Sequence, residues 1–181
     1  LFVGAGLYLS SRESNPEHLE LRQAFLLTNS AWISISLFGS LPFLFSNLNL
    51  NFIDAFFEST SGITTTGSTI IPNLEQVSYG ILLWRAVLQW LGGIGIIVMA
   101  VAILPMLSIG GMQLFKTESY ETPDKIIPRA AIFASGISIV YIVLTSTWAF
   151  MLWLAGMPIF DSITHAMTTL ATGGYSTKSE S

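Results

Sequence analysis

Long apolar segments alternate with short polar ones along the chain. Three of them cover residues 24–46, 79–109 and 130–155. Each is long enough to cross a bilayer, which takes about 20 mainly apolar residues, so we predict a transmembrane helix for each. Residues 1–10 are mainly apolar from the first position, and we interpret them as the end of a preceding transmembrane helix.

Two shorter apolar segments, residues 51–62 and 158–170, predict half-length helices. A helix of about 12 residues is roughly 18 Å long, which is about half of a bilayer. Each is followed by a stretch rich in Thr and Gly, residues 63–67 and 171–175, instead of a polar loop. Bare backbone at membrane depth is tolerated only where protein covers it or where it lines a water-filled path. This pattern predicts re-entrant loops.

The chain matches itself when it is shifted by 107 positions. The matched positions are mostly Pro, Asp, Arg, Thr and Gly, which hydrophobicity alone does not align. They pair Pro16 with Pro123, Arg22 with Arg129, Asp54 with Asp161, Thr65 with Thr172 and Gly67 with Gly174. Similarity at a fixed period indicates a repeated unit. We predict a helix–re-entrant loop–helix unit, complete over residues 15–110 and truncated before its closing helix over residues 130–181.

Composition narrows the class of protein further. Apolar residues make up 51% of the chain and charged residues 10%, whereas soluble domains carry roughly 25% charged residues. Disorder and a soluble globule are therefore excluded. The chain has no Cys and two His, which excludes disulfides and His- or thiolate-rich metal sites. A net charge of −4 with seven Lys and Arg offers no basic surface for nucleic acid. We find no nucleophile–base pair, so we do not expect an enzyme.

Positive charge is distributed unevenly between the loops. Residues 47–52 and 68–78 contain no Lys or Arg. The loops at 10–23 and 111–129 contain Arg12, Arg22, Lys116, Lys125 and Arg129. By the positive-inside rule, the two basic loops are cytoplasmic.

The Thr/Gly stretches are candidate cation ligands. A dehydrated monovalent cation needs several oxygens at once, and backbone carbonyls supply them in potassium filters. Gly adopts the required backbone angles without a steric penalty, and the C-terminal end of a preceding helix favours a cation. An ordinary polar turn is the alternative for either stretch. The candidate ligands are Thr64, Thr65, Thr66, Gly67, Ala171, Thr172, Gly173 and Gly174.

Several charged residues accompany these stretches. Asp54 and Asp161 fall in the first turns of the half-length helices, where carboxylates stabilise the helix end, and we prefer this role to ion binding. Arg85 lies inside the second span, where a charge usually pairs internally. We expect it to pair with a carboxylate such as Glu58 and support the filter, or to extend outward. His165 takes the repeat position of Glu58, as a packing residue or, alternatively, a pH sensor.

The motifs DAFFESTSGITTTGST, LLWRAVLQWLGGIGIIVMAVAILPM, GGMQLFKTES and DSITHAMTTLATGGYST carry a family resemblance. They resemble the Trk/Ktr/HKT superfamily of potassium transporters, specifically the bacterial Trk membrane subunit of the TrkH/TrkG type. The resemblance implies an all-α integral membrane fold of four helix–pore-loop–helix units, with Gly67 and Gly174 as filter glycines. It also implies a homodimer, a cytoplasmic nucleotide-binding regulatory subunit and a bacterial inner-membrane location.

The sequence therefore predicts a pore-forming potassium uptake subunit that needs two further units of its full-length chain. K⁺ is the transported ion, and no cofactor is predicted. A cation-coupled secondary transporter of K⁺, with H⁺ or Na⁺ symport, is the alternative. An inverted repeat is disfavoured, because each unit contains an even number of full spans and both copies have the same orientation. The motif Gly92-Gly93-Ile94-Gly95 lies inside a span, so we interpret it as close helix packing and not as a nucleotide site.

Overall fold

The structure is a computed structural model that describes residues 21–107 and 126–179. All regular structure in these two ranges is helical. The predicted terminal helix at residues 1–10 and the predicted loop at 111–125 lie outside the described residues. The elements are α2 (Leu21–Gly39), α3 (Leu41–Leu44), α4 (Phe52–Ile63), the 3₁₀ helix η1 (Leu74–Gln76), α5 (Tyr79–Leu107), α7 (Ile126–Leu154) and α8 (Ile159–Leu170).

Two helices in the described ranges are long and apolar enough to cross a membrane, over Tyr79–Met99 of α5 and Ala134–Leu154 of α7. Helix α7 begins at Ile126, four residues before the predicted start. Pro128 does not prevent this, because a proline in the first turn removes an N–H that has no partner within the helix.

The predicted continuous helix over residues 24–46 is interrupted. Helix α2 ends at Gly39, and the four-residue α3 follows Ser40. Pro42 is the physical reason, because proline lacks an N–H for the helical ladder and clashes with the carbonyl four residues earlier. Helix α2 also falls outside the candidate spans, since its 19 residues include the hydrophilic Arg22, Gln23 and Asn29.

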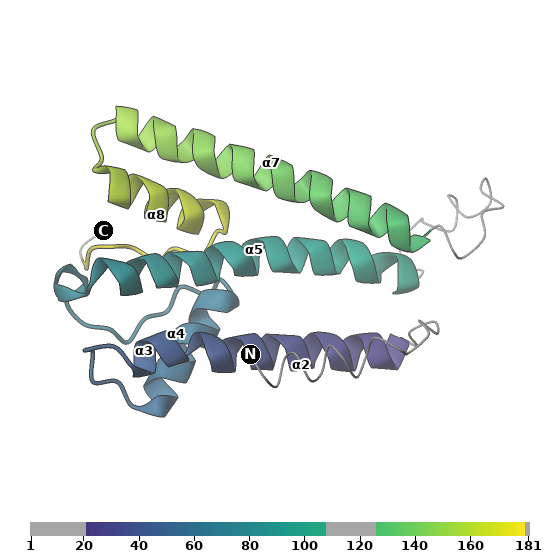
Figure 1. Cartoon of the computed structure of the whole chain (residues 1–181), viewed down its shortest axis with the longest axis horizontal. Coiled ribbons are helices and arrows are strands. Elements are labelled where there is room, and N and C mark those ends of the chain that lie inside the picture. Colours follow the sequence, from purple (N-terminus) through teal and green to yellow (C-terminus); the bar gives the residue numbers. More distant parts are fainter. Residues whose placement is uncertain (1–20, 108–125, 180–181) are drawn as a thin grey trace.

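Helix α5 occupies the centre of the arrangement (Figure 1). The short helix α4 packs against α2 and α5, and the short helix α8 packs against α5 and α7. After both short helices the chain turns and runs back along α5 toward the end from which it came (Figure 1). This is the geometry of two re-entrant loops that share one central helix.

Two glycines allow α5 to approach both short helices closely. A Cβ atom on Gly92 would overlap the carbonyl oxygen of Ile63, the last residue of α4. A Cβ atom on Gly93 would lie 3.0 Å from the Cα of Ala171, directly after α8. The interpretation of this motif as close packing therefore holds, and its partners are the ends of the two short helices.

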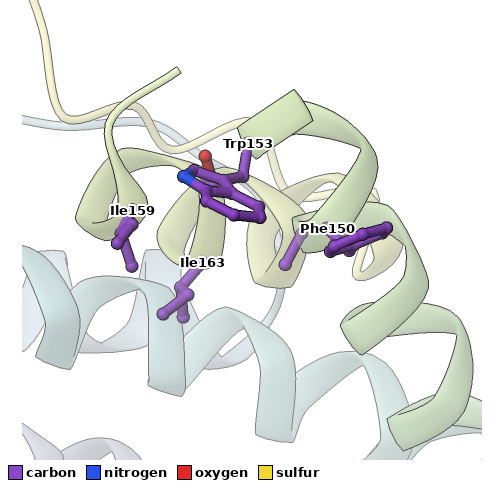
Figure 2. Close-up of a pocket in the computed structure, with 6 residues that line it drawn as sticks. Phe150, Trp153, Ile159 and Ile163 are labelled. Atoms are coloured by element: carbon purple, nitrogen blue, oxygen red, sulfur yellow. The ribbon is translucent and has the colours of Figure 1, made fainter. Parts of the chain in front are cut away.

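The two units differ in how their apolar surfaces are covered. In the first unit, Phe43 and Ala55 are fully buried in a cluster that includes Leu82 and Leu88 of α5. Their repeat counterparts, Phe150 and Ser162, line an open cleft of about 270 Å³ between α7 and α8 (Figure 2). Phe150 is 55% exposed there. The surface that α5 covers in the first unit therefore corresponds to an open cleft in the second unit.

Candidate functional site: two paired Thr/Gly loops

The two Thr/Gly stretches have the same backbone conformation. Thr65 and Thr172 have φ angles of 56° and 55°, and Gly67 and Gly174 have φ angles of 79° and 77°. Positive φ is uncommon for a residue with a side chain and is unusual for β-branched Thr. Its occurrence at both matched positions gives the 107-residue repeat a structural counterpart that apolar similarity does not explain.

The same backbone hydrogen bonds turn the chain at the end of each short helix. Thr64 N–H donates to Thr60 O at 2.9 Å, and its counterpart Ala171 N–H donates to Met167 O at 3.1 Å. The next residues, Thr65 and Thr172, donate to Gly62 O and Thr169 O. The loop therefore satisfies carbonyls that a helix end otherwise leaves without partners.

Most loop carbonyls remain available as ligands. Within residues 21–107 and 126–179, no hydrogen bond is accepted by the carbonyls of residues 64–67, 171, 172 or 174. The φ angle is negative at Thr64 (−82°) and positive at Thr65 and Gly67. The loop is therefore not a regular strand, in which successive carbonyls point in opposite directions. The carbonyl of Gly173 differs, because it accepts a hydrogen bond from Gln89.

The two loops lie directly against each other. A Cβ atom on Gly67 would overlap the carbonyl oxygen of Gly173, so only glycine fits at position 67. The hydroxyl of Tyr175 donates to the carbonyl of Glu58 at 2.9 Å and to that of Ser68 at 3.3 Å. Neighbouring units thus meet through their loops as well as through their helices.

A buried ion pair stands behind the first loop. Arg85 Nε lies 2.8 Å from Glu58 Oε1, and the two side chains are 1% and 0% exposed. The Glu58 carboxylate also accepts hydrogen bonds from Thr69 Oγ1 at 2.9 Å and from Ile70 N–H at 3.2 Å. Of the two orientations considered for Arg85, the structure has the internal pair and not the outward one.

Arg85 also reaches the second loop. Its Nη1 donates to the carbonyl of Ser176 at 3.1 Å, and its guanidinium lies 4.0 Å above the centre of the Tyr175 ring. Its Nη2 has no hydrogen-bond partner among the described residues. One cation of the first unit therefore contacts the short helix α4 of its own unit and the chain at the end of the neighbouring loop.

Sequence reasoning missed Gln89 and Tyr175. Gln89 is fully buried and contacts both Gly173 and Tyr175. The signal for Gln89 was its position: a second polar residue one helical turn after Arg85, on the same face of an apolar helix. Tyr175 gave no such signal, because its contacts depend on the packing of the two units.

The remaining candidate side chains belong to the two short helices: Asp54 and Asp161 lie in their first turns, and His165 lies farther along α8. Asp54 lies in the first turn of α4, where its N–H is capped by Asn51 Oδ1 at 2.9 Å. Asp161, in the first turn of α8, accepts a hydrogen bond from Thr177 Oγ1 at 2.8 Å. His165 Nε2 lies 3.5 Å from the same hydroxyl. Among the described residues, no three His, Cys, Asp or Glu side chains gather as a metal site.

Comparisons with known proteins agree with this architecture. The TrkH family model, described as a cation transport protein, matches residues 1–181. The chain is 46% identical to the Trk system potassium uptake protein TrkH of Salmonella typhimurium over 180 residues, covering 98% of the chain and 37% of that protein. It is 49% identical to the Trk system potassium uptake protein TrkI of Halomonas elongata over 160 residues, covering 88% of the chain and 32% of that protein.

A solved structure has the same fold. The crystal structure of the potassium transporter TrkH from Vibrio parahaemolyticus superimposes with a TM-score of 0.84 at 44% identity, over 98% of this chain and 35% of that one. The chain thus spans about a third of the length of these relatives, whose names are those of transporters and not of enzymes. With a family model matched over its whole length, the chain belongs to the TrkH family of membrane cation transport proteins.

Proposed function

We propose that this chain supplies two of the units that surround a potassium pathway, and that backbone carbonyls of the two Thr/Gly loops bind the ion. The observation that carries the proposal is the pair of loops with matched φ angles and carbonyls without hydrogen-bond partners among the described residues. Free carbonyls can replace the water shell of a cation, and α4 and α8 end at the loops, where their partial negative charge favours a cation.

The proposed ligands lie in the ranges 64–67 and 171–174, with one restriction. The carbonyl of Gly173 accepts a hydrogen bond from Gln89, so Ala171, Thr172 and Gly174 are the better candidates in the second loop. In this proposal Asp54, Asp161, Glu58 and Arg85 are supporting residues and do not contact the ion.

Two loops do not enclose an ion, and we propose that further units complete the ring. The relatives are about three times as long as this chain. The cleft between α7 and α8 is open where the matching surface of the first unit is covered by α5 (Figure 2). A closing helix of the second unit would fill this cleft, and two more units of the same full-length chain would surround the pathway.

The setting of this pore is also part of the proposal. We place the chain in the bacterial inner membrane as a multi-pass protein, with the end of α5 and the start of α7 at the cytoplasmic face, because the basic residues between 110 and 129 lie there. Assembly as a homodimer and docking of a cytoplasmic nucleotide-binding subunit follow from the family resemblance. Symport of K⁺ with H⁺ or Na⁺ is the alternative mechanism.

Replacement of Gly67 by Ser tests the filter. The added Cβ overlaps the carbonyl oxygen of Gly173, and the positive φ costs about 1–2 kcal/mol in a residue with a side chain. In the complete protein, Rb⁺ uptake should be abolished or should lose its preference over Na⁺. The matched control is Gly80→Ser, because a Cβ atom there meets nothing within 4 Å. Uptake and selectivity of Gly67→Ser equal to those of the control would refute the proposed ligands.

A further inference from the structure

Gln89 of α5 holds the second loop on both sides of Gly174. Its Nε2 donates to the carbonyl of Gly173 at 2.9 Å, and its Oε1 accepts from the N–H of Tyr175 at 3.1 Å. The side chain is fully buried. Reversal of the amide would place a donor against a donor and an acceptor against an acceptor, so the two contacts define its orientation.

These two hydrogen bonds fix the direction of the Gly174 carbonyl. The carbonyl of Gly174 and the N–H of Tyr175 belong to one trans peptide group, which is planar, and so they point in opposite directions. Because the N–H is held against Gln89, the carbonyl points away from α5. Gly174 is exposed, whereas Gly173 and Tyr175 on either side are buried.

The amide of Gln89 lies where the two loops meet. A Cβ atom on Gly173 would overlap this amide, and a Cβ atom on Gly67 would lie 3.7 Å from its Nε2. Gly173 thus leaves space for the Gln89 amide, and Gly67 lies in van der Waals range of it. Gln89 follows Arg85 by one helical turn, and Arg85 holds the carbonyl of Ser176, three residues after Gly173.

We propose that Gln89 is a positioning residue that sets the preference for K⁺ over Na⁺ at the second loop, by holding the Gly174 carbonyl in one direction. The inference rests on the proposed function, in which that carbonyl is an ion ligand. A peptide group released from Gln89 can rotate, and its carbonyl can then follow a smaller ion or turn away from the pathway. The preference falls in either case.

The test compares two variants of the complete protein in proteoliposomes, with Rb⁺ uptake measured against competing K⁺ or Na⁺. Gln89→Met keeps the length of the side chain and removes both hydrogen bonds. Gln89→Leu also removes both hydrogen bonds, with an apolar side chain that is shorter than that of Met. The matched control is Gln76→Met, an exposed residue of η1. We expect the K⁺/Na⁺ preference to fall about tenfold in Gln89→Met and in Gln89→Leu, the equivalent of roughly 1.4 kcal/mol.

The outcomes separate this inference from the proposed function. A purely structural role would reduce the amount of folded protein and the uptake of both ions together, with an unchanged ratio, and that result overturns the inference. A wild-type ratio in Gln89→Met alongside an altered ratio in Gly67→Ser overturns the role of Gln89 and leaves the filter in place. An unchanged K⁺/Na⁺ ratio in Gln89→Met and also in Gly67→Ser refutes the proposed filter itself. If Gln89→Met does not accumulate, an unchanged ratio in Gln89→Leu overturns the inference.

Discussion

Removal of Glu58 from its ion pair with Arg85 should destabilise the protein more than removal of Arg85. The two side chains are 2.8 Å apart and almost completely buried. Removal of one partner from a buried pair typically costs about 3–5 kcal/mol, because the other charge remains without compensation. Without Arg85, the Glu58 carboxylate keeps its hydrogen bonds from Thr69 Oγ1 and Ile70 N–H, whereas without Glu58 the guanidinium keeps only the Ser176 carbonyl and the Tyr175 ring. Glu58→Gln should therefore cost more than Arg85→Gln.

The contacts of each residue set the size of the effect. Glu58→Gln leaves a buried cation that keeps only the Ser176 carbonyl and the Tyr175 ring, so we expect the upper part of that range, about 4–5 kcal/mol. Arg85→Gln removes the cation and its contacts to the second loop, and we expect about 3 kcal/mol. The double variant should cost clearly less than the sum, because neither charge then remains unpaired.

Denaturant titration of the complete protein in mixed micelles, followed by Trp fluorescence, gives the free energies of unfolding. Arg22→Gln is the matched control, since Arg22 is exposed at the start of α2. K⁺/Na⁺ preference is measured on the same samples, because Arg85 also contacts the second loop. Normal stability and an unchanged preference in Arg85→Gln would refute its role as filter support. Equal costs for the two single variants, with additivity in the double variant, would refute the argument from unpaired charge.

Two further predictions concern the packing of α5 and the loop beside it. Gly92→Ala should sharply reduce the amount of folded complete protein, because its Cβ overlaps the backbone of Ile63, whereas Gly80→Ala should accumulate normally on a membrane-protein expression gel. Ser179 N–H and Oγ both donate to Glu75 at 2.8 Å, and the backbone hydrogen bond from Ser179 is the main cause that lowers the pKa of Glu75 below 4.5. The stabilisation is therefore present above that value and is lost as pH falls through the lowered pKa. The difference in melting temperature between wild type and Glu75→Gln should stay constant between about pH 6 and pH 8 and shrink in acid; a change within the neutral range would contradict this origin.

The positions of most helices could be predicted from the sequence, because the length and hydrophobicity of each segment determine them. The helix at Phe52–Ile63 is shifted by one residue from the predicted range 51–62, and the helix at Ile159–Leu170 begins one residue after its predicted start. The break after Gly39 was missed because the segment around Pro42 is apolar throughout, and a hydropathy pattern does not register a missing N–H. The all-α membrane fold and the family resemblance are both confirmed by the comparisons.

The candidate site was only partly accessible. Thr65, Gly67, Thr172 and Gly174 could be selected because the repeat aligns them, and the structure gives all four positive φ angles. The contacts of Gln89 could not be selected in the same way. They join residues 84 and 86 positions apart, and only the packing of α5 against the second loop brings them together.

The backbone of the two loops follows the repeat, whereas several side-chain contacts behind the loops do not, and the proposed function explains this difference. The φ angles of the two loops match within about two degrees, and a positive φ also recurs at Asn49 and Gly156, so the course of the chain is repeated where carbonyls are the proposed ligands. The supporting side chains are repeated only in part: Asp161 matches Asp54, but His165 replaces Glu58 and lies beside Thr177 instead of an arginine. Each loop meets a different neighbour, since α5 of the first unit holds the second loop through Arg85 and Gln89. An ion at the axis requires similar carbonyls from every unit, whereas the groups behind each loop need only fit the helix that packs there.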